Sequence, residues 1–151
     1  MENYLELKEN IVEGNFNIAR RLAKTLSKEE FGNFMMGQPY DVESEVVFYF
    51  FLVDWLFEEE SAELQELASA VMSFGLNWMP GAYSLGLGHM RRAMELDSDN
   101  LNYKQGILIF HDIPDRLLPK QEAIEISKEI LSKDPSCAAA QNILQKYDID
   151  F

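Results

Sequence analysis

Hydrophobic residues are concentrated in one unbroken run, residues 46–57 (VVFYFFLVDWLF), in which Asp54 carries the only charge. As a helix the run would span roughly 18 Å, and its length falls short of the roughly 20 apolar residues needed to cross a bilayer. It is long for a strand, and no other segment offers a strand to pair with it. The pattern predicts a central helix of a soluble protein, apolar on nearly all sides and packed on several of them.

Elsewhere apolar residues recur at helical spacing, and polar residues mark the predicted helix ends. Gly14 follows a first helix, as expected of a residue that ends helices. Residues 27–30 (SKEE) have the form of a capping box, which begins a helix. Ser61 opens the helix after the central one, and the acids in 41–45 begin the central helix near its positive end. We therefore predict an all-α fold of about eight or nine helices in stacked antiparallel pairs.

The second half of the chain contains an internal repeat. Residues 91–97 (RRAMELD) align with residues 128–134 (KEILSKD), so that Asp97 and Asp134 lie 37 residues apart. Each copy is predicted to end a helix and begin a turn into the next one. Repetition at such a period is typical of stacked helical units. We expect one helical domain over residues 1–151, with N-terminal helices in 1–80 and the repeat in 81–151.

The second copy resembles the second helix of a tetratricopeptide repeat, because Ala123 and Pro135 have that family's spacing of twelve residues. The first copy differs, with Gly86 at the small position and Ser98 in place of the proline. The period exceeds the usual 34 residues by three, which we expect the loop at 111–116 to absorb. Residues 138–147 are predicted to form a final helix that covers the open end of the stack.

Charge is unevenly distributed along the chain. The net charge is −13, and residues 29–90 contain eleven acids without one Lys or Arg. An acidic surface can serve solubility alone. So long a stretch without a base nevertheless predicts a basic protein partner, and it disfavours nucleic acid because phosphates would be repelled.

Composition favours an ordered cytoplasmic protein. Hydrophobic residues make up 47% of the chain, which argues against disorder. Cys137 is the only cysteine and has no partner for an internal disulfide. The N-terminus lacks the basic and apolar regions of a secretory signal, and no segment predicts membrane insertion.

The sequence contains no recognisable catalytic motif. His89 and His111 are the only histidines, and neither HExxH nor CxxC spacing provides metal ligands. His89 precedes Arg92 by about one helical turn, which favours a surface position. Cys137 lies beside Ala138 and is interpreted as a small packing residue. We expect no enzymatic activity, no metal and no cofactor.

The candidate partner-binding residues are six acidic residues and two aromatic residues. Asp54 either pairs with Arg91 or another base inside the fold, or lies on a partly covered face that presents carboxylates to a cationic partner. Residues 58–60 either form a solvated helix end or belong to an acidic surface whose shape fits a partner. The aromatic candidates could anchor a partner, although burial in the core is the commoner fate of such residues. The full set is Glu43, Asp54, Glu58, Glu59, Glu60, Glu63, Trp78 and Tyr83.

The chain is similar to the small helical immunity proteins that bacteria encode beside polymorphic or contact-dependent toxins. The resemblance is carried by residues 81–97 (GAYSLGLGHMRRAMELD), residues 113–123 (IPDRLLPKQEA) and the repeat at 123–135. It implies that the protein neutralises a cognate toxin domain, often a basic nuclease, by docking an acidic surface on it. The alternative is a tetratricopeptide-type adaptor or cochaperone that binds a peptide or protein. Grooves of that kind commonly clamp a carboxylate terminus with Lys, Arg and Asn, which the acid-only middle of the chain does not favour.

Overall fold

The computed structural model describes residues 2–40 and 46–151, and all regular structure in these residues is helical. α5 continues into the π-helix η1, and a single residue separates α7 from α8, so the described chain contains nine helices if each pair counts as one. The predicted all-α fold is confirmed. The elements are α1 (Glu2–Val12), α2 (Phe16–Ala23), α3 (Lys28–Met36), α4 (Val46–Glu58), α5 (Ala62–Ala70), η1 (Val71–Gly75), α6 (Ala82–Leu96), α7 (Leu101–Ile107), α8 (Ile109–Asp112), α9 (Lys120–Lys133) and α10 (Ala138–Lys146).

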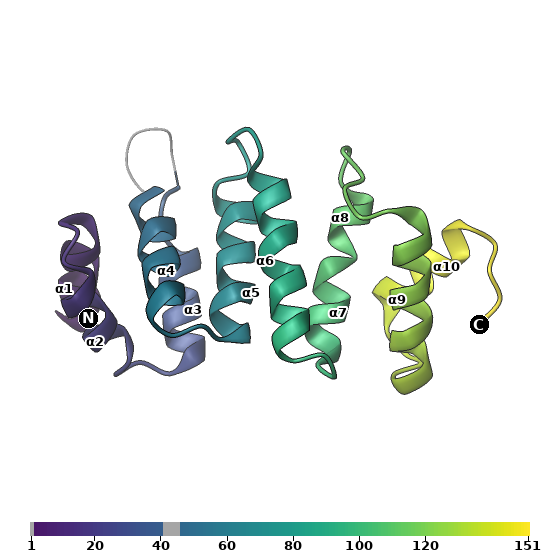
Figure 1. Cartoon of the computed structure of the whole chain (residues 1–151), viewed down its shortest axis with the longest axis horizontal. Helices are drawn as coiled ribbons and strands as arrows, with labels where there is room; N and C mark the ends of the chain where they lie inside the picture. Colours follow the sequence, from purple (N-terminus) through teal and green to yellow (C-terminus); the bar gives the residue numbers. More distant parts are fainter. Residues whose placement is uncertain (1, 41–45) are drawn as a thin grey trace.

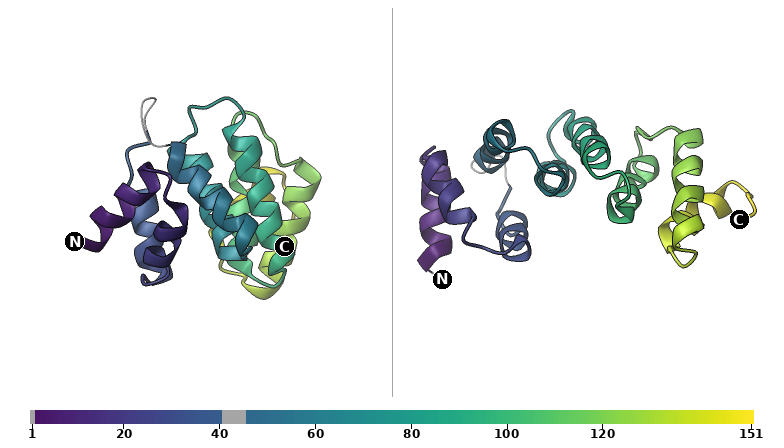
Figure 2. Two further views of the ribbon diagram at one scale, coloured as in Figure 1. Left: turned by 60° about the vertical axis from the view of Figure 1, so that its left-hand side comes forward. Right: turned by 60° about the horizontal axis from the view of Figure 1, so that its bottom comes forward.

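The helices form an elongated stack with the two chain termini at opposite ends (Figure 1). Helices that follow one another in the sequence are neighbours in space, as with α5 and α6 or α9 and α10. Figure 2 shows the stack from two further sides, and the right-hand view shows successive helices alternating between two rows. Most helices therefore have one side turned towards solvent, which limits how much of an apolar helix the stack can cover.

The predicted helix boundaries in the N-terminal half are confirmed by their caps. Ser27 and Glu30 form the capping box at the start of α3: the Glu30 backbone N–H donates to Ser27 Oγ at 3.2 Å, and the Ser27 N–H donates to Glu30 Oε2 at 2.8 Å. Ser61 caps α5 by accepting from the Leu64 N–H at 3.2 Å. Gly14 follows α1 with a φ of 77°, a conformation that glycine adopts without strain.

α4 is the predicted central helix, and it contacts α1, α2 and α5, but it is not covered all round. Its buried face consists of Phe48, Phe51, Leu52 and Trp55. Phe50 and Phe57 are exposed on the other side, where no described element covers the helix. The expectation of packing on several sides therefore fails for this half of α4, because the stack has only two rows. The predicted start of the helix at 41–45 lies outside the described residues.

Buried side chains form two clusters that share α5 and α6. The N-terminal cluster includes Ala68 and Ala82, while the C-terminal cluster includes Ala62, Met90 and Ala93. Both helices therefore contribute to both clusters. The two halves of the stack are joined through this shared pair of helices.

The two copies of the sequence repeat end their helices, α6 and α9, in the same way. Asp97 follows α6 with φ −143° and ψ 77°, and Asp134 follows α9 with φ −131° and ψ 89°. In each case the aspartate N–H donates to a carbonyl four residues earlier. The predicted final helix is confirmed as α10, which packs on α9. The loop expected at 111–116 begins later, because residues 111 and 112 belong to α8 and His111 is buried.

Gly86 occupies the small position of the first repeat because two neighbours crowd it. A Cβ there would lie 2.4 Å from Ser73 Oγ and 3.3 Å from the Phe110 ring. The Gly86 carbonyl also accepts a hydrogen bond from Ser69 Oγ at 2.7 Å, which fixes the distance between α5 and α6. The close approach of these helices therefore requires glycine.

Gly86→Ala should therefore destabilise the protein by about 1–2 kcal/mol, since overpacking outweighs the gain in helix propensity. Ser73→Ala removes the clashing oxygen, which has no hydrogen-bond partner among the described residues. We expect most of the cost to disappear in the Ser73→Ala/Gly86→Ala double variant, as measured by denaturant unfolding of all four proteins. Additive effects would contradict this packing explanation.

Candidate protein-binding surface

Most of the predicted partner-binding carboxylates form ion pairs within the fold. The pairs are Asp54 with Arg20 at 2.7 Å, Glu59 with Lys24 at 2.7 Å, Glu60 with Arg92 at 2.8 Å, and Glu63 with Lys28. All four bases lie outside residues 29–90. The acidic segment is therefore partly neutralised by bases from α2 and the residue that follows it, from the start of α3, and from α6.

Asp54 has the internal partner that one of the two interpretations required. That partner is Arg20 on α2, whereas Arg91 binds Glu122 on α9. The Asp54 side chain is 43% exposed, so it pairs at the edge of the α2–α4 contact. Such a half-exposed pair contributes on the order of 1 kcal/mol or less.

Glu58 is exposed like Glu59 and Glu60, but unlike them it has no ion-pair partner among the described residues. Glu43 lies outside the described residues. The candidate at the end of α4 is therefore a single free carboxylate beside two paired ones, rather than three equivalent acids.

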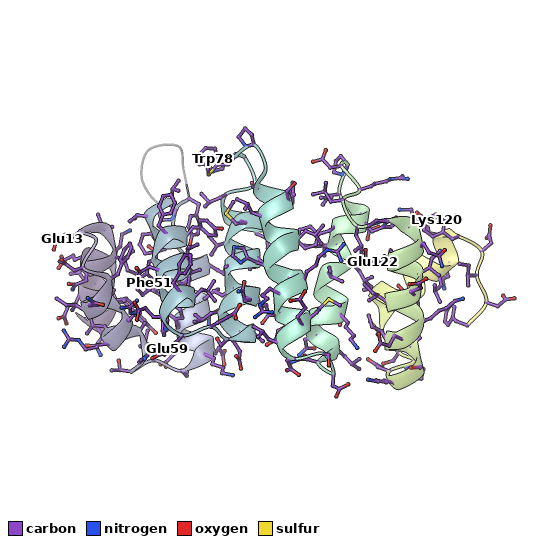
Figure 3. All side chains as sticks on the ribbon, in the orientation of Figure 1. Glu13, Phe51, Glu59, Trp78, Lys120 and Glu122 are labelled. Atoms are coloured by element: carbon purple, nitrogen blue, oxygen red, sulfur yellow. The ribbon has the colours of Figure 1, made fainter. Side chains whose placement is uncertain are left out.

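The two aromatic candidates are not close to the acids at the end of α4. Trp78 lies on the loop between η1 and α6, on the opposite long edge of the stack from Glu59, with Trp78 at the top and Glu59 at the bottom of the view (Figure 3). Its side chain is 43% exposed, and Nε1 donates to the Tyr40 carbonyl at 2.9 Å. Tyr83 is half-buried and packs on the C-terminal core cluster. The predicted residues thus do not form one site.

The structure presents a different apolar surface, the α4 stripe, which consists of Phe50, Val53 and Phe57. Phe50 is 57% exposed and Phe57 is 87% exposed, and Val53 lies between them on the same face. The sequence contained one signal for this stripe: its residues are spaced three and four apart, so they share a helix face. Because residues 46–57 are apolar on nearly every side of the helix, the sequence offered no reason to expect this face, rather than another, to be exposed.

A hollow of about 470 Å³ adjoins the α4 stripe between α4, α5 and α6. His89 lies on one side of it, half-buried, which corrects the predicted surface position. Its Nδ1 donates to Gln65 Oε1 at 2.7 Å, and its Nε2 accepts from the Tyr49 hydroxyl at 2.8 Å. Burial lowers the pKa of His89, which favours the neutral ring that these two hydrogen bonds require.

Glu60 provides a pH-dependent connection between α5 and α6. Hydrogen bonding from Arg92 is the main cause that lowers its pKa to about 2, from an ordinary value of 4.5, and a bond from Gln65 adds to this effect. Because the pKa is lower in the folded state, the pairing stabilises the fold above pH 4.5, and the contribution is lost as pH falls towards 2.

We expect the denaturation midpoint of Glu60→Gln to fall less steeply than that of the wild type between pH 4.5 and pH 2. Urea unfolding at several pH values in this window measures the difference. Glu58→Gln is the matched control and should run parallel to the wild type, since Glu58 is exposed and has no ion-pair partner among the described residues. Parallel curves for Glu60→Gln would contradict a stabilising role for this pair.

Within residues 2–40 and 46–151, no group of three or more His, Cys, Asp or Glu side chains is placed to hold a metal ion. No helix in the same residues is long and apolar enough to cross a membrane. Cys137 is buried at the start of α10, as its interpretation as a packing residue predicted. In comparisons with known proteins, no family model, no curated protein and no solved structure matches this chain.

Proposed function

We propose that this protein binds another protein through the α4 stripe, and that the partner is a basic toxin domain which it neutralises as an immunity protein. The observation that carries the proposal is the exposure of Phe50 and Phe57 on the most apolar helix of the chain. Aromatic side chains of this kind are typical anchors of protein interfaces. The adjoining hollow offers space for a side chain of the partner.

The basic character of the partner is inferred from charge. The chain carries a net charge of −13, and Glu58 is a carboxylate next to Phe57 without an ion-pair partner among the described residues. Attraction between opposite charges speeds association, while apolar anchors slow dissociation. Since Glu59 and Glu60 already have partners in the fold, we place the proposed contact on the α4 stripe with Glu58 at its edge.

The alternative function, a tetratricopeptide-type adaptor that clamps a peptide carboxylate, has less support. Lys24, directly after α2, and Lys28, at the start of α3, are each paired with a glutamate. A terminal carboxylate would have to displace those glutamates. A partner with positive charge would not.

The test expresses the basic C-terminal domain of the secreted protein encoded beside this gene, together with each variant, and measures bacterial growth. Phe57→Glu should lose protection because it replaces an apolar anchor of the proposed contact with a charge. Phe74→Glu is the matched control: Phe74 is 63% exposed but lies on η1 and not on α4. It should protect like the wild type.

Three outcomes separate the parts of this proposal. Equal protection by Phe57→Glu and the wild type would rule out the α4 stripe as the contact. A neighbouring domain that is harmless when expressed alone would contradict the immunity role. Association that does not slow as salt rises would contradict electrostatic attraction, since exposed charges are screened beyond roughly 8 Å at physiological ionic strength.

A further inference from the structure

An apolar cleft of about 580 Å³ opens between α3 and α5, and we name it the α3–α5 cleft. α3 contacts η1, the continuation of α5, more than it contacts α5 itself. α3 and α5 therefore lie apart along the rest of their length. Phe31 of α3 and Leu64 and Leu67 of α5 line the cleft, and Trp55 lines it from α4. These side chains give it apolar walls with an aromatic contribution from two helices.

Gly32 leaves additional space in the wall formed by α3. A Cβ at this position would meet nothing within 4 Å. Glycine weakens the interior of a helix, and no crowding by a described neighbour requires it here, in contrast to Gly86. A Cβ at Gly32 would therefore displace no described residue.

The charges around the cleft leave one carboxylate uncompensated. Three of its four glutamates are in ion pairs: Glu59 with Lys24, Glu60 with Arg92, and Glu63 with Lys28. Glu66 is the fourth, and no described residue forms an ion pair or a hydrogen bond with it. It is half-buried on α5, beside the apolar walls.

Poor solvation makes Glu66 a favourable place for an added positive charge. Burial is the main cause that raises the pKa of its carboxyl, and the nearby charge of Glu63 raises it further. A cation placed against a partly desolvated carboxylate gains more than one placed against a fully hydrated carboxylate. Glu66 is therefore a specific point of charge complementarity within an apolar surface.

We infer that the α3–α5 cleft binds a basic segment of a partner protein, which inserts one apolar side chain between the helices and places an adjacent lysine or arginine on Glu66. The apolar walls and the space at Gly32 receive the apolar side chain. The lysines of the cleft are paired with Glu59 and Glu63, which disfavours an acidic segment.

This site is distinct from the α4 stripe. Trp55 lines the cleft from the buried face of α4, whereas Phe57 lies two residues later and so points about 200° away around the helix. The inference does not depend on the immunity role, and either site can fail its test alone.

The test uses the full chain and observes its two tryptophan indole N–H groups by NMR, with Trp78→Phe to assign them. The probe is the tripeptide acetyl-Lys-Phe-Arg-amide. It should shift the Trp55 resonance in a saturable manner and leave that of Trp78 unchanged, because only Trp55 lines the cleft. Acetyl-Glu-Phe-Glu-amide, with reversed charge, and acetyl-Lys-Ser-Arg-amide, without the apolar group, should bind much more weakly.

Two variants with matched controls test the named contacts. Glu66→Gln should weaken binding of the probe by about fivefold through loss of a charge pair, while Glu58→Gln should not change it. Gly32→Phe should fill the cleft and abolish the Trp55 shift. Gly88→Phe is its control and should leave the shift intact, since Gly88 is also helical and a Cβ there would meet nothing within 4 Å.

The absence of a saturable Trp55 shift would overturn the inference. So would equal binding by the wild type, Glu66→Gln and Gly32→Phe. Phenethylamine that binds as tightly as the tripeptide would show that the cleft takes a small amine, and it would overturn the assignment to a protein segment.

Discussion

Leu144→Asp is expected to destabilise the protein by about 4 kcal/mol, because it removes a fully buried side chain and leaves an unpaired charge in its place. Leu144 lies on α10, together with the buried residues Ala140 and Ile143, and these three side chains belong to the C-terminal core cluster. A loss of this size is a large part of the stability of a typical domain. The melting temperature should fall by roughly 10 °C.

Asn142→Asp is the control for this prediction. Asn142 is exposed on the same helix, so the substitution adds the same charge without burying it and should change stability by less than about 0.5 kcal/mol. Guanidinium unfolding of both variants gives the comparison. An unchanged unfolding curve for Leu144→Asp would mean that α10 is not docked on α9. Truncation after residue 135 should expose the same apolar face.

The second large effect is expected for Phe51→Ala, at about 4 kcal/mol. Phe51 is completely buried on α4. Its ring centroid lies 5.5 Å from that of Phe16, 6.4 Å from that of Phe31 and 5.8 Å from that of Trp55. The substitution removes all three aromatic contacts and leaves a cavity that the surrounding helices can fill only in part.

Phe50→Ala is the matched control, because it removes the same side chain from the adjacent position. Phe50 is exposed, so its loss should change stability by less than about 1 kcal/mol and should instead weaken binding of the proposed partner. Phe51→Leu gives a graded measurement if Phe51→Ala is too unstable to study. Equal destabilisation by Phe50→Ala and Phe51→Ala would contradict the assignment of the buried face of α4.

Local features of this chain were predictable from the sequence because their causes lie within a few residues. The capping box at Ser27 depends on hydrogen bonds to Glu30, three residues away, and the cap at Ser61 depends on the N–H of Leu64. The repeated helix ends at Asp97 and Asp134 likewise follow from their own short segments.

The candidate site was less predictable because its residues depend on distant partners. Asp54 pairs with Arg20, 34 residues earlier, and Glu60 pairs with Arg92, 32 residues later. A count of charges along the chain cannot reveal these pairs, and it therefore overestimated how much of the acidic segment is free. The three acids at the end of α4 are all exposed, but among the described residues only Glu58 of the three lacks an ion-pair partner.

The sequence by itself determined that the chain is helical, where several helices begin, and that residues 46–57 form the most apolar of them. Helical periodicity and capping are local properties, and they carry this information directly. Only the tertiary structure decided that Phe51 is buried while Phe50 and Phe57 are exposed. A helix that is apolar on every side has no preferred face of its own, so the positions of its neighbours in a two-row stack determine which side remains open to a partner.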